Sequence, residues 1–438
     1  MPSVRDTRLM REAASASRKR VRLVSLMGCA LAACATPEVP EDAARLDASR
    51  VDARGAQLED AAVDAVADAV SIVDAPDAIT ARPVLELATS EFSAFGDSIT
   101  FGFEIGTGRY PATVRWPERA ASTLGFDATR VQNFGISAST AQTMWVDEML
   151  PRFATAPPPD AVRAVFAGTN DARCHGADPL ALEGYREALR AMIAYQLAER
   201  SVRPATDAGV VYSGTWGSFP ALWHRYTSER DARAEFDADG PEVWIGTYSL
   251  CEGHSGVGSA LEVLVDGATH YTRPVMPMCR AACALSGIAY PGQTFAPYVI
   301  RLEGLAPGSH RIALVNRGGG FAYLSWIASP STAHESHVFV GNLTRNTAAG
   351  YAAHPPYNRL SDDVVDLYNG TIEEVVQSFR ATSHPVQLVD LHAAFVGNLS
   401  GTGADALMQS DQAHPNERGL SVMADAFSDR IRATLDLR

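Results

Sequence analysis

Apolar segments of strand length alternate with segments of helical periodicity from residue 83 to about residue 205. Short apolar runs bounded by turn residues predict strands, and apolar positions that recur every three or four residues predict helices. Such alternation predicts a parallel sheet covered by helices on both faces, with ligands bound beyond the carboxyl ends of the strands. The predicted strands are residues 92–95, 131–134 and 161–166, and the strongest helical pattern covers residues 180–200.

The pattern changes between residues 206 and 330, where short alternating runs are separated by turn pairs such as Asp266-Gly267 and Pro307-Gly308. Strands at this spacing favour an antiparallel sandwich. Helix–strand alternation returns from residue 331 onwards. We therefore expect one α/β domain, built from residues 83–205 and 331–438, that an all-β insert interrupts. The insert should sit beside or below the ligand-binding loops, because it joins the domain at the opposite edge.

The first 33 residues have the pattern of an export signal, with a basic segment at residues 18–22 and a short apolar segment at residues 23–31. The apolar segment is too short to span a bilayer as a mature helix. Small residues before Cys34 resemble the lipobox of bacterial lipoproteins, although an ordinary signal peptide with a chance cysteine also fits. We expect an exported protein of the cell envelope, tethered to a membrane through acyl chains at Cys34, or a secreted one.

Residues 34–82 are rich in Ala, Asp and Val, and residues 35–81 contain no aromatic side chain. Such a segment cannot bury enough apolar surface to fold, and it predicts an extended, acidic linker. The whole chain of 438 residues has a formal net charge of −14. This charge argues against a nucleic-acid partner, which would need a basic face.

Candidate chemistry begins with Ser98, which lies in Gly-Asp-Ser-Ile-Thr where a predicted strand turns into a predicted helix. The first N–H groups of a helix can stabilise an anion that develops at such a serine. A helix-capping motif would produce the same local pattern.

Asp411 and His414 form the second candidate pair, in the loop before the last predicted helix. Histidine suits a general base near neutral pH, and a carboxylate three residues away can fix its tautomer. A capping aspartate beside a surface histidine is the simpler alternative.

Taken together, these motifs resemble the blocks of the SGNH (GDSL-type) hydrolase family, in the family's order. The matching segments are Gly-Asp-Ser-Ile-Thr at residues 96–100, Gly135 in Asn-Phe-Gly-Ile-Ser, Gly-Thr-Asn-Asp at residues 168–171, and Asp411-x-x-His414. The resemblance implies a flavodoxin-like three-layer α/β/α sandwich with a parallel sheet, here interrupted by an all-β jelly-roll insert.

The same resemblance implies that Ser98 is the nucleophile, His414 the general base and Asp411 the orienting carboxylate. The oxyanion hole would consist of the N–H groups of Ser98 and Gly135 and the side chain of Asn170. Asp97 and Asp171 are expected to be structural, and no cofactor or metal is expected. The G-x-S-x-G elbow of α/β-hydrolases is a different pattern, which disfavours that class.

The insert resembles galactose-binding-like jelly-roll modules, on segments such as Gly-Leu-Ala-Pro-Gly-Ser-His at residues 304–310. Many such modules bind glycans and others are structural, so fold analogy leaves sugar binding open. Trp216, Trp223 and Trp244 are candidates for stacking against sugars, although core packing is the more common role of such residues.

Outside the signal segment and Cys34, the cysteines are Cys174, Cys251, Cys279 and Cys283. Four cysteines allow three pairings. A Cys279–Cys283 bond or a link from Cys251 within the insert is favoured, and Cys174 is either free or tied to Cys251.

These observations favour a membrane-tethered carbohydrate esterase that removes O-acetyl or other small acyl groups from a polysaccharide. A lipase or thioesterase with the same residues is the main alternative, and a non-catalytic glycan-binding lipoprotein is a third. Loops after the strands usually carry specificity. We therefore expect Tyr110 and Trp116 to bind substrate, together with Asn346, Tyr351 and His354.

Overall fold

The computed structural model describes residues 82–154, 161–219, 224–250, 260–274, 283–285, 288–290, 295–318, 320–330, 336–352 and 359–438. The predicted signal peptide, Cys34 and most of the linker lie outside these residues, as do Trp223 and His354. Residues 82–438 form one compact unit. Within the described part of the chain, no helix is long and apolar enough to cross a membrane.

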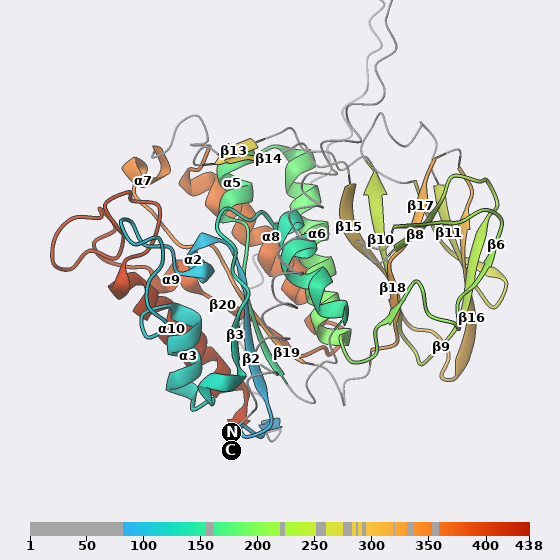
Figure 1. Cartoon of the computed structure of the whole chain (residues 1–438), viewed down its shortest axis with the longest axis horizontal. Helices are drawn as coiled ribbons and strands as arrows, with labels where there is room; N and C mark the ends of the chain where they lie inside the picture. Colours follow the sequence, from blue (N-terminus) through green and yellow to red (C-terminus); the bar gives the residue numbers. More distant parts are fainter. Residues whose placement is uncertain are drawn as a thin grey trace, which may run out of the picture. The chain divides into compact units, whose positions relative to one another are not determined.

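A five-stranded parallel sheet forms the centre of the α/β part (Figure 1). Its spatial order is β20-β19-β4-β2-β3, and every neighbouring pair is parallel. If the five strands are numbered 1 to 5 along the chain and the sheet is read from the β3 edge, the order is 2-1-3-4-5. This is the order of flavodoxin-like folds, which confirms the predicted fold class. The strands are β2 (Glu91–Gly96), β3 (Val131–Asn133), β4 (Ala161–Phe166), β19 (His337–Gly341) and β20 (Val386–Val389).

Helices cover both faces of this sheet, as Figure 1 shows. One face carries α3 (Trp116–Leu124) and α10 (Glu417–Thr434), and the other carries α6 (Pro179–Ala198) and α8 (Asp362–Arg380). Shorter helical elements complete the domain: α2 (Ser98–Phe101), η1 (Ala128–Arg130), α4 (Ala141–Met144), η2 (Trp145–Met149), η3 (Leu150–Ala154), α5 (Thr169–His175), α7 (Ala348–Ala352) and α9 (Leu391–Ala394). The terminal strands β1 (Val84–Leu85) and β21 (Asp436–Leu437) pair in parallel.

Trp116 lies in this core and not in a substrate pocket, which corrects its predicted role. Pro117 follows it within the first turn of α3, where proline is well tolerated. The Trp116 side chain is fully buried, and its ring stacks on Phe427 of α10 with centroids 4.4 Å apart. The residue therefore joins two helices of one layer.

The insert folds as antiparallel sheets. A four-stranded sheet has the order β15-β10-β18-β5, and a five-stranded sheet has the order β12-β11-β16-β9-β6. Their apolar side chains form a second core. The strands are β5 (Arg203–Pro204), β6 (Val211–Ser213), β9 (Arg233–Asp239), β10 (Val243–Leu250), β11 (Ala260–Val265), β12 (Ala268–Pro274), β15 (Phe295–Leu302), β16 (Ser309–Asn316) and β18 (Trp326–Ala328). Two smaller sheets contain β7 (Gly217–Phe219), β8 (His224–Thr227) and β17 (Ala322–Leu324), and β13 (Cys283–Leu285) with β14 (Ile288–Tyr290).

The four-stranded sheet packs against α6, so the insert shares a core with the α/β part. Trp145 Nε1 donates a hydrogen bond of 2.9 Å to Tyr248 Oη across this boundary. Arg301 donates to Thr382 Oγ1, 2.7 Å away, just beyond the end of α8. Figure 1 shows these sheets on the side of α6 and α8 away from α2, beside the domain as expected, whereas the β13–β14 hairpin lies beside α5.

Trp244 belongs to this boundary, which corrects its candidacy as a sugar-stacking residue. Its side chain is fully buried, and its ring contacts those of Phe379 and His384. Its Nε1 donates to Glu242, whose other oxygen lies 2.9 Å from His384 Nε2. Trp216, by contrast, is partly exposed and packs on Tyr212.

Replacing Trp244 by alanine should lower the free energy of unfolding by about 3–5 kcal/mol, because the change leaves a large cavity between the insert and α8. Urea denaturation followed by circular dichroism measures the loss. Trp216→Ala is the matched control and should cost less, since Trp216 is already partly exposed. A loss for Trp244→Ala no larger than that of the control would show that this boundary contributes little to stability.

Candidate active site

Ser98 is the first residue of α2, directly after β2 ends at Gly96. A side chain at Gly96 would overlap the Phe166 carbonyl and Thr100, so only glycine permits this tight turn. Asp97 caps α2 by accepting a 2.9 Å hydrogen bond from Ile99 N, which is the structural role expected of it. The turn leaves Ser98 slightly exposed at the carboxyl edge of the sheet.

The loop before α10 brings His414 to Ser98. Ser98 Oγ lies 2.9 Å from His414 Nε2, and His414 Nδ1 lies 2.6 Å from Asp411 Oδ2. The second oxygen of Asp411 accepts N–H groups from Ala413 and from His414 itself. Asn416 caps α10 and holds the other end of the loop. The structure thus brings the three predicted residues into one hydrogen-bonded line.

Asp411 is held in its ionised form. Burial alone would raise its pKa, but the hydrogen bond and charge of His414 and the two backbone N–H groups lower the pKa to about 2. An ionised Asp411 accepts the proton on Nδ1 of His414. The lone pair of Nε2 is then directed at the Ser98 hydroxyl, as a general base requires.

The two predicted oxyanion donors outside Ser98 differ in their availability. Asn170 Nδ2 donates to the Ser139 carbonyl at 2.9 Å, and because an amide carries two N–H groups, one remains for a ligand. The Gly135 N–H donates to Asn133 Oδ1 at 3.0 Å. In this conformation Gly135 is therefore not a free oxyanion donor, contrary to its predicted role. Its lack of a side chain instead lets the backbone of α2 approach closely.

Asp171 is structural, as predicted, since its carboxylate accepts the N–H of Ala141 at 2.9 Å and fixes the start of α4.

Glu148 is a second structural acid of this kind, which sequence reasoning missed. It lies on the π-helical turn η2, and its Oε2 accepts the Gly96 N–H at 3.0 Å. Burial raises the pKa of Glu148 well above its ordinary value. No motif marks Glu148, because its role depends on a helix that packs beneath the nucleophile turn.

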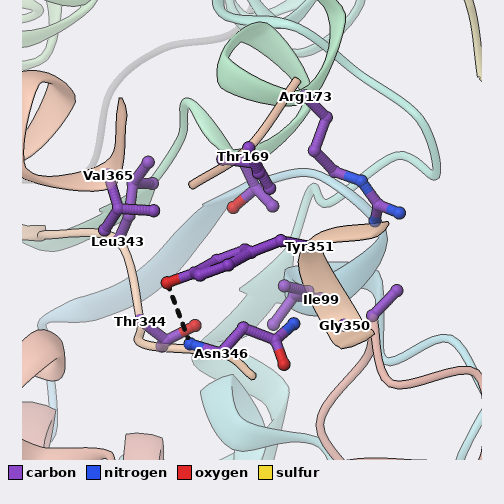
Figure 2. Close-up of a pocket in the computed structure, with 11 residues that line it drawn as sticks. Ile99, Thr169, Arg173, Leu343, Thr344, Asn346, Gly350, Tyr351 and Val365 are labelled. Carbon is purple, nitrogen blue, oxygen red and sulfur yellow. Dashed lines mark hydrogen bonds between the residues drawn. The ribbon is translucent and has the colours of Figure 1, made fainter. Parts of the chain in front are cut away.

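A small pocket that is partly open to solvent lies beside these residues (Figure 2). Three of its lining residues, Ile99, Thr169 and Ala413, are the sequence neighbours of Ser98, Asn170 and His414. The others are Arg173, Leu343, Thr344, Asn346, Gly350, Tyr351, Leu360 and Val365. Asn346 and Tyr351 thus line the pocket as expected, whereas Tyr110 and Trp116 are not among its lining residues.

Tyr351 is the largest of these side chains, and Figure 2 shows its ring extending across the pocket. Its hydroxyl donates to Asp362 Oδ1 at 2.8 Å and accepts from Asn346 N at 3.2 Å. Tyr110 lies elsewhere, partly buried, with its hydroxyl bonded to the backbone of Glu417. Arg173 was not predicted as a site residue, and its charge interacts with the carboxylates of Asp411 and Asp97.

Cys174, four residues after Asn170, is disulfide-bonded, which excludes the expectation that it is free. Its partner lies outside the side chains that the structure describes, as do Cys251, Cys279 and the thiol of Cys283. Within the described residues, no group of three or more His, Cys, Asp or Glu side chains could hold a metal ion.

The sequence model of the GDSL-like Lipase/Acylhydrolase family matches residues 94–243. This part of the chain is similar to that family. The match includes Ser98, Gly135 and Asn170 and ends before Asp411 and His414. No curated protein matches the chain.

Solved structures of similar proteins share little sequence with the chain. A lipase/acylhydrolase from Enterococcus faecalis is 13% identical, with 78% of this chain and 96% of that one covered and a TM-score of 0.34. Est24, a carbohydrate acetylesterase from Sinorhizobium meliloti, is 12% identical, with coverages of 78% and 98% and a TM-score of 0.35. A lipolytic G-D-S-L family protein from Veillonella parvula DSM 2008 is 12% identical, with coverages of 78% and 97% and a TM-score of 0.35.

The difference in free energy of unfolding between Asp97→Asn and wild type should change with pH, in favour of the variant as the pH rises. Burial raises the pKa of Asp97 from 3.8 to about 6, so ionising it in the folded state costs free energy that is absent below pH 4 and complete above pH 6. At about 1.4 kcal/mol per pKa unit, the difference between variant and wild type should grow by up to about 3 kcal/mol between pH 4 and pH 8.

Urea unfolding of both proteins at several pH values measures this difference, and other titrating groups cancel in the comparison. Asparagine retains an oxygen that can accept the Ile99 N–H, so the cap of α2 is preserved. A difference that stays constant with pH would contradict the buried-acid interpretation of Asp97.

Proposed function

We propose that the protein is a serine esterase in which Ser98 is the nucleophile, His414 the general base and Asp411 the orienting carboxylate. The observation that carries this proposal is the continuous contact from Ser98 Oγ through both nitrogens of His414 to Asp411. In this reaction, Ser98 Oγ attacks the ester carbonyl carbon while its proton passes to His414 Nε2. The ionised Asp411 stabilises the imidazolium that forms.

The negative charge that develops on the carbonyl oxygen needs fixed donors. The Ser98 N–H at the start of α2 and the second amide hydrogen of Asn170 are suited to this role. Gly135 would join them only if its N–H gave up the bond to Asn133. His414 then transfers its proton to the leaving alcohol, and water attacks the acyl-enzyme by the same route, releasing a carboxylic acid and restoring Ser98.

We further infer that the acyl group is small and that the alcohol belongs to a polysaccharide. The pocket beside Ser98 supports the first part, because the Tyr351 ring crosses it and Leu343 and Val365 close it with apolar side chains. An acetyl group suits such a space better than a long chain does. The all-β insert, similar in pattern to sugar-binding modules, supports the second part, with Trp216 its remaining described candidate for stacking.

Export and attachment to a membrane through Cys34 remain part of the proposal, on the sequence pattern alone. The domain bounds of 1–33, 34–82, 83–205, 206–330 and 331–438 likewise rest on the sequence pattern alone.

A lipase or thioesterase is the second candidate. It is favoured by Ile105 and Ile136, which are 39% and 38% exposed on the loops that follow Ser98 and Gly135 and offer apolar contact to a lipid substrate.

Ser98→Ala should abolish ester hydrolysis, reducing kcat by at least about 10³-fold while leaving the fold intact. The assay compares acetylated polysaccharides with p-nitrophenyl esters of increasing acyl length, and release of acetate is measured directly. Turnover of acetyl esters well above that of octanoyl esters would support the carbohydrate esterase. Preference for long chains would favour the lipase, and full activity of the variant would refute the assignment of Ser98.

Tyr351→Ala should shift acyl preference towards longer chains, because it removes the ring that crosses the pocket. We expect the ratio of butyryl to acetyl kcat/KM to rise about tenfold, the scale of a few methylene groups in an apolar pocket. Tyr351→Phe is the matched control, since it keeps the ring and loses only the bonds to Asp362 and Asn346. If both variants keep the wild-type ratio, Tyr351 does not limit acyl length.

A further inference from the structure

Gln409 joins the loop that carries Ser98 to the loop that carries His414. Its side chain is 7% exposed, and both ends of its amide are bonded. Oε1 accepts the Ile105 N–H at 2.9 Å. Nε2 donates to the carbonyls of Phe103 and Pro415, at 2.8 Å and 3.0 Å. A single buried side chain therefore spans two segments that lie about 300 residues apart in the sequence.

On the Ser98 side, the bonds reach the residue that closes the turn of α2. Phe103 N donates to the Ser98 carbonyl at 2.9 Å, while the Phe103 carbonyl accepts from Gln409. The Phe103 ring also packs against the imidazole of His414, with ring centroids 4.7 Å apart and planes inclined at 45°. Moving Phe103 would therefore disturb both the turn that presents Ser98 and the ring of His414.

On the His414 side, the backbone of Gln409 completes a circuit. Gln409 N donates to the His414 carbonyl at 2.8 Å, and its side chain bonds the carbonyl of the next residue, Pro415. A closed path of hydrogen bonds thus runs from Ser98 through Phe103 and Gln409 to His414. The path is separate from the Asp411 contact, which orients the imidazole within its own loop.

We propose that Gln409 is a positioning residue that sets how His414 Nε2 approaches Ser98 Oγ. The inference rests on the proposed roles of Ser98 and His414. Among the described residues, the partners of the Gln409 side chain are backbone groups, so it acts through the two loops and not on the substrate. Displacing reacting groups by about 1 Å can cost on the order of 10² in rate, so a tie between these two loops matters for catalysis.

The test variant is Gln409→Met, which keeps the length of the side chain and removes its hydrogen bonds. With p-nitrophenyl acetate as substrate, kcat should fall 10- to 100-fold while KM stays within twofold of wild type. Inactivation by a fluorophosphonate, which also needs His414 to activate Ser98, should slow by a similar factor. The matched control is Gln387→Met on β20, where the glutamine accepts from Arg430, and its kcat should be unchanged.

A purely structural role for Gln409 would lower the melting temperature and leave kcat and the inactivation rate of the folded variant within twofold of wild type, which would overturn the proposal. If Gln409→Met does not fold, Gln409→Glu provides the same test, because it keeps the acceptor for Ile105 N and replaces the amide donor by a carboxylate oxygen, which cannot donate to Phe103 and Pro415 when ionised. Ser98→Ala, assayed alongside, distinguishes a failure of the proposed esterase function from a failure of the positioning role of Gln409. Activity that survives Ser98→Ala refutes the proposed function itself, whereas a normal kcat in a folded Gln409 variant refutes only the positioning role.

Discussion

The pairing of β4 with β19 is the constraint on which the rest of the structure depends. These parallel strands come from opposite sides of the insert, and Gly341 lies opposite Phe166, which in turn lies opposite Gly96. The three strands therefore end in one row, and the loops that follow them start from the same edge of the sheet. Val389 of β20 lies opposite Gly341 in the same row, and the chain that follows β20 carries His414. Ser98 and His414 therefore meet although 316 positions separate them. An insert of any size is compatible with it, provided that its two ends return to the domain.

The insert lies between these two strands in the sequence, but it is not a separate tethered module. In α6, residues on all sides of the helix are buried, because one side faces the parallel sheet and another faces the four-stranded sheet of the insert. Trp244, Tyr248 and Trp326 of the insert share a core with the helices of the α/β part. This shared core joins the insert to the α/β part through buried side chains.

The sequence allowed correct prediction of those features that depend on local chain geometry. The turn at Ser98, the cap at Asp97 and the Asp411–His414 spacing each follow from a few neighbouring residues. Trp116 was misassigned and the role of Trp244 stayed open, because burial of an aromatic ring depends on partners far away in the chain, Phe427 and Phe379. The hydrogen bond from Gly135 N to Asn133 could not be predicted either, since a motif specifies a residue and not the partner of its N–H. Gln409 and Glu148 carry no motif, and only the packed loops reveal what they bond.

The acids around Ser98 divide into two kinds, and their environments explain why one of them alone suits catalysis. Asp97 and Glu148 are buried and each accepts a backbone N–H of the nucleophile turn, and burial raises the pKa of both. Asp411 is less deeply buried, and its bonds to His414 and two backbone N–H groups lower its pKa. A carboxylate that orients an imidazolium has to remain charged throughout the reaction, and of these three acids only Asp411 is stabilised in that form. Asp97 and Glu148 instead hold the backbone at the edge of the core by accepting its N–H groups. A neutral carboxyl group can fill this role, because its oxygens still accept an N–H. It avoids the free energy that burying a charge in a low-dielectric core would cost.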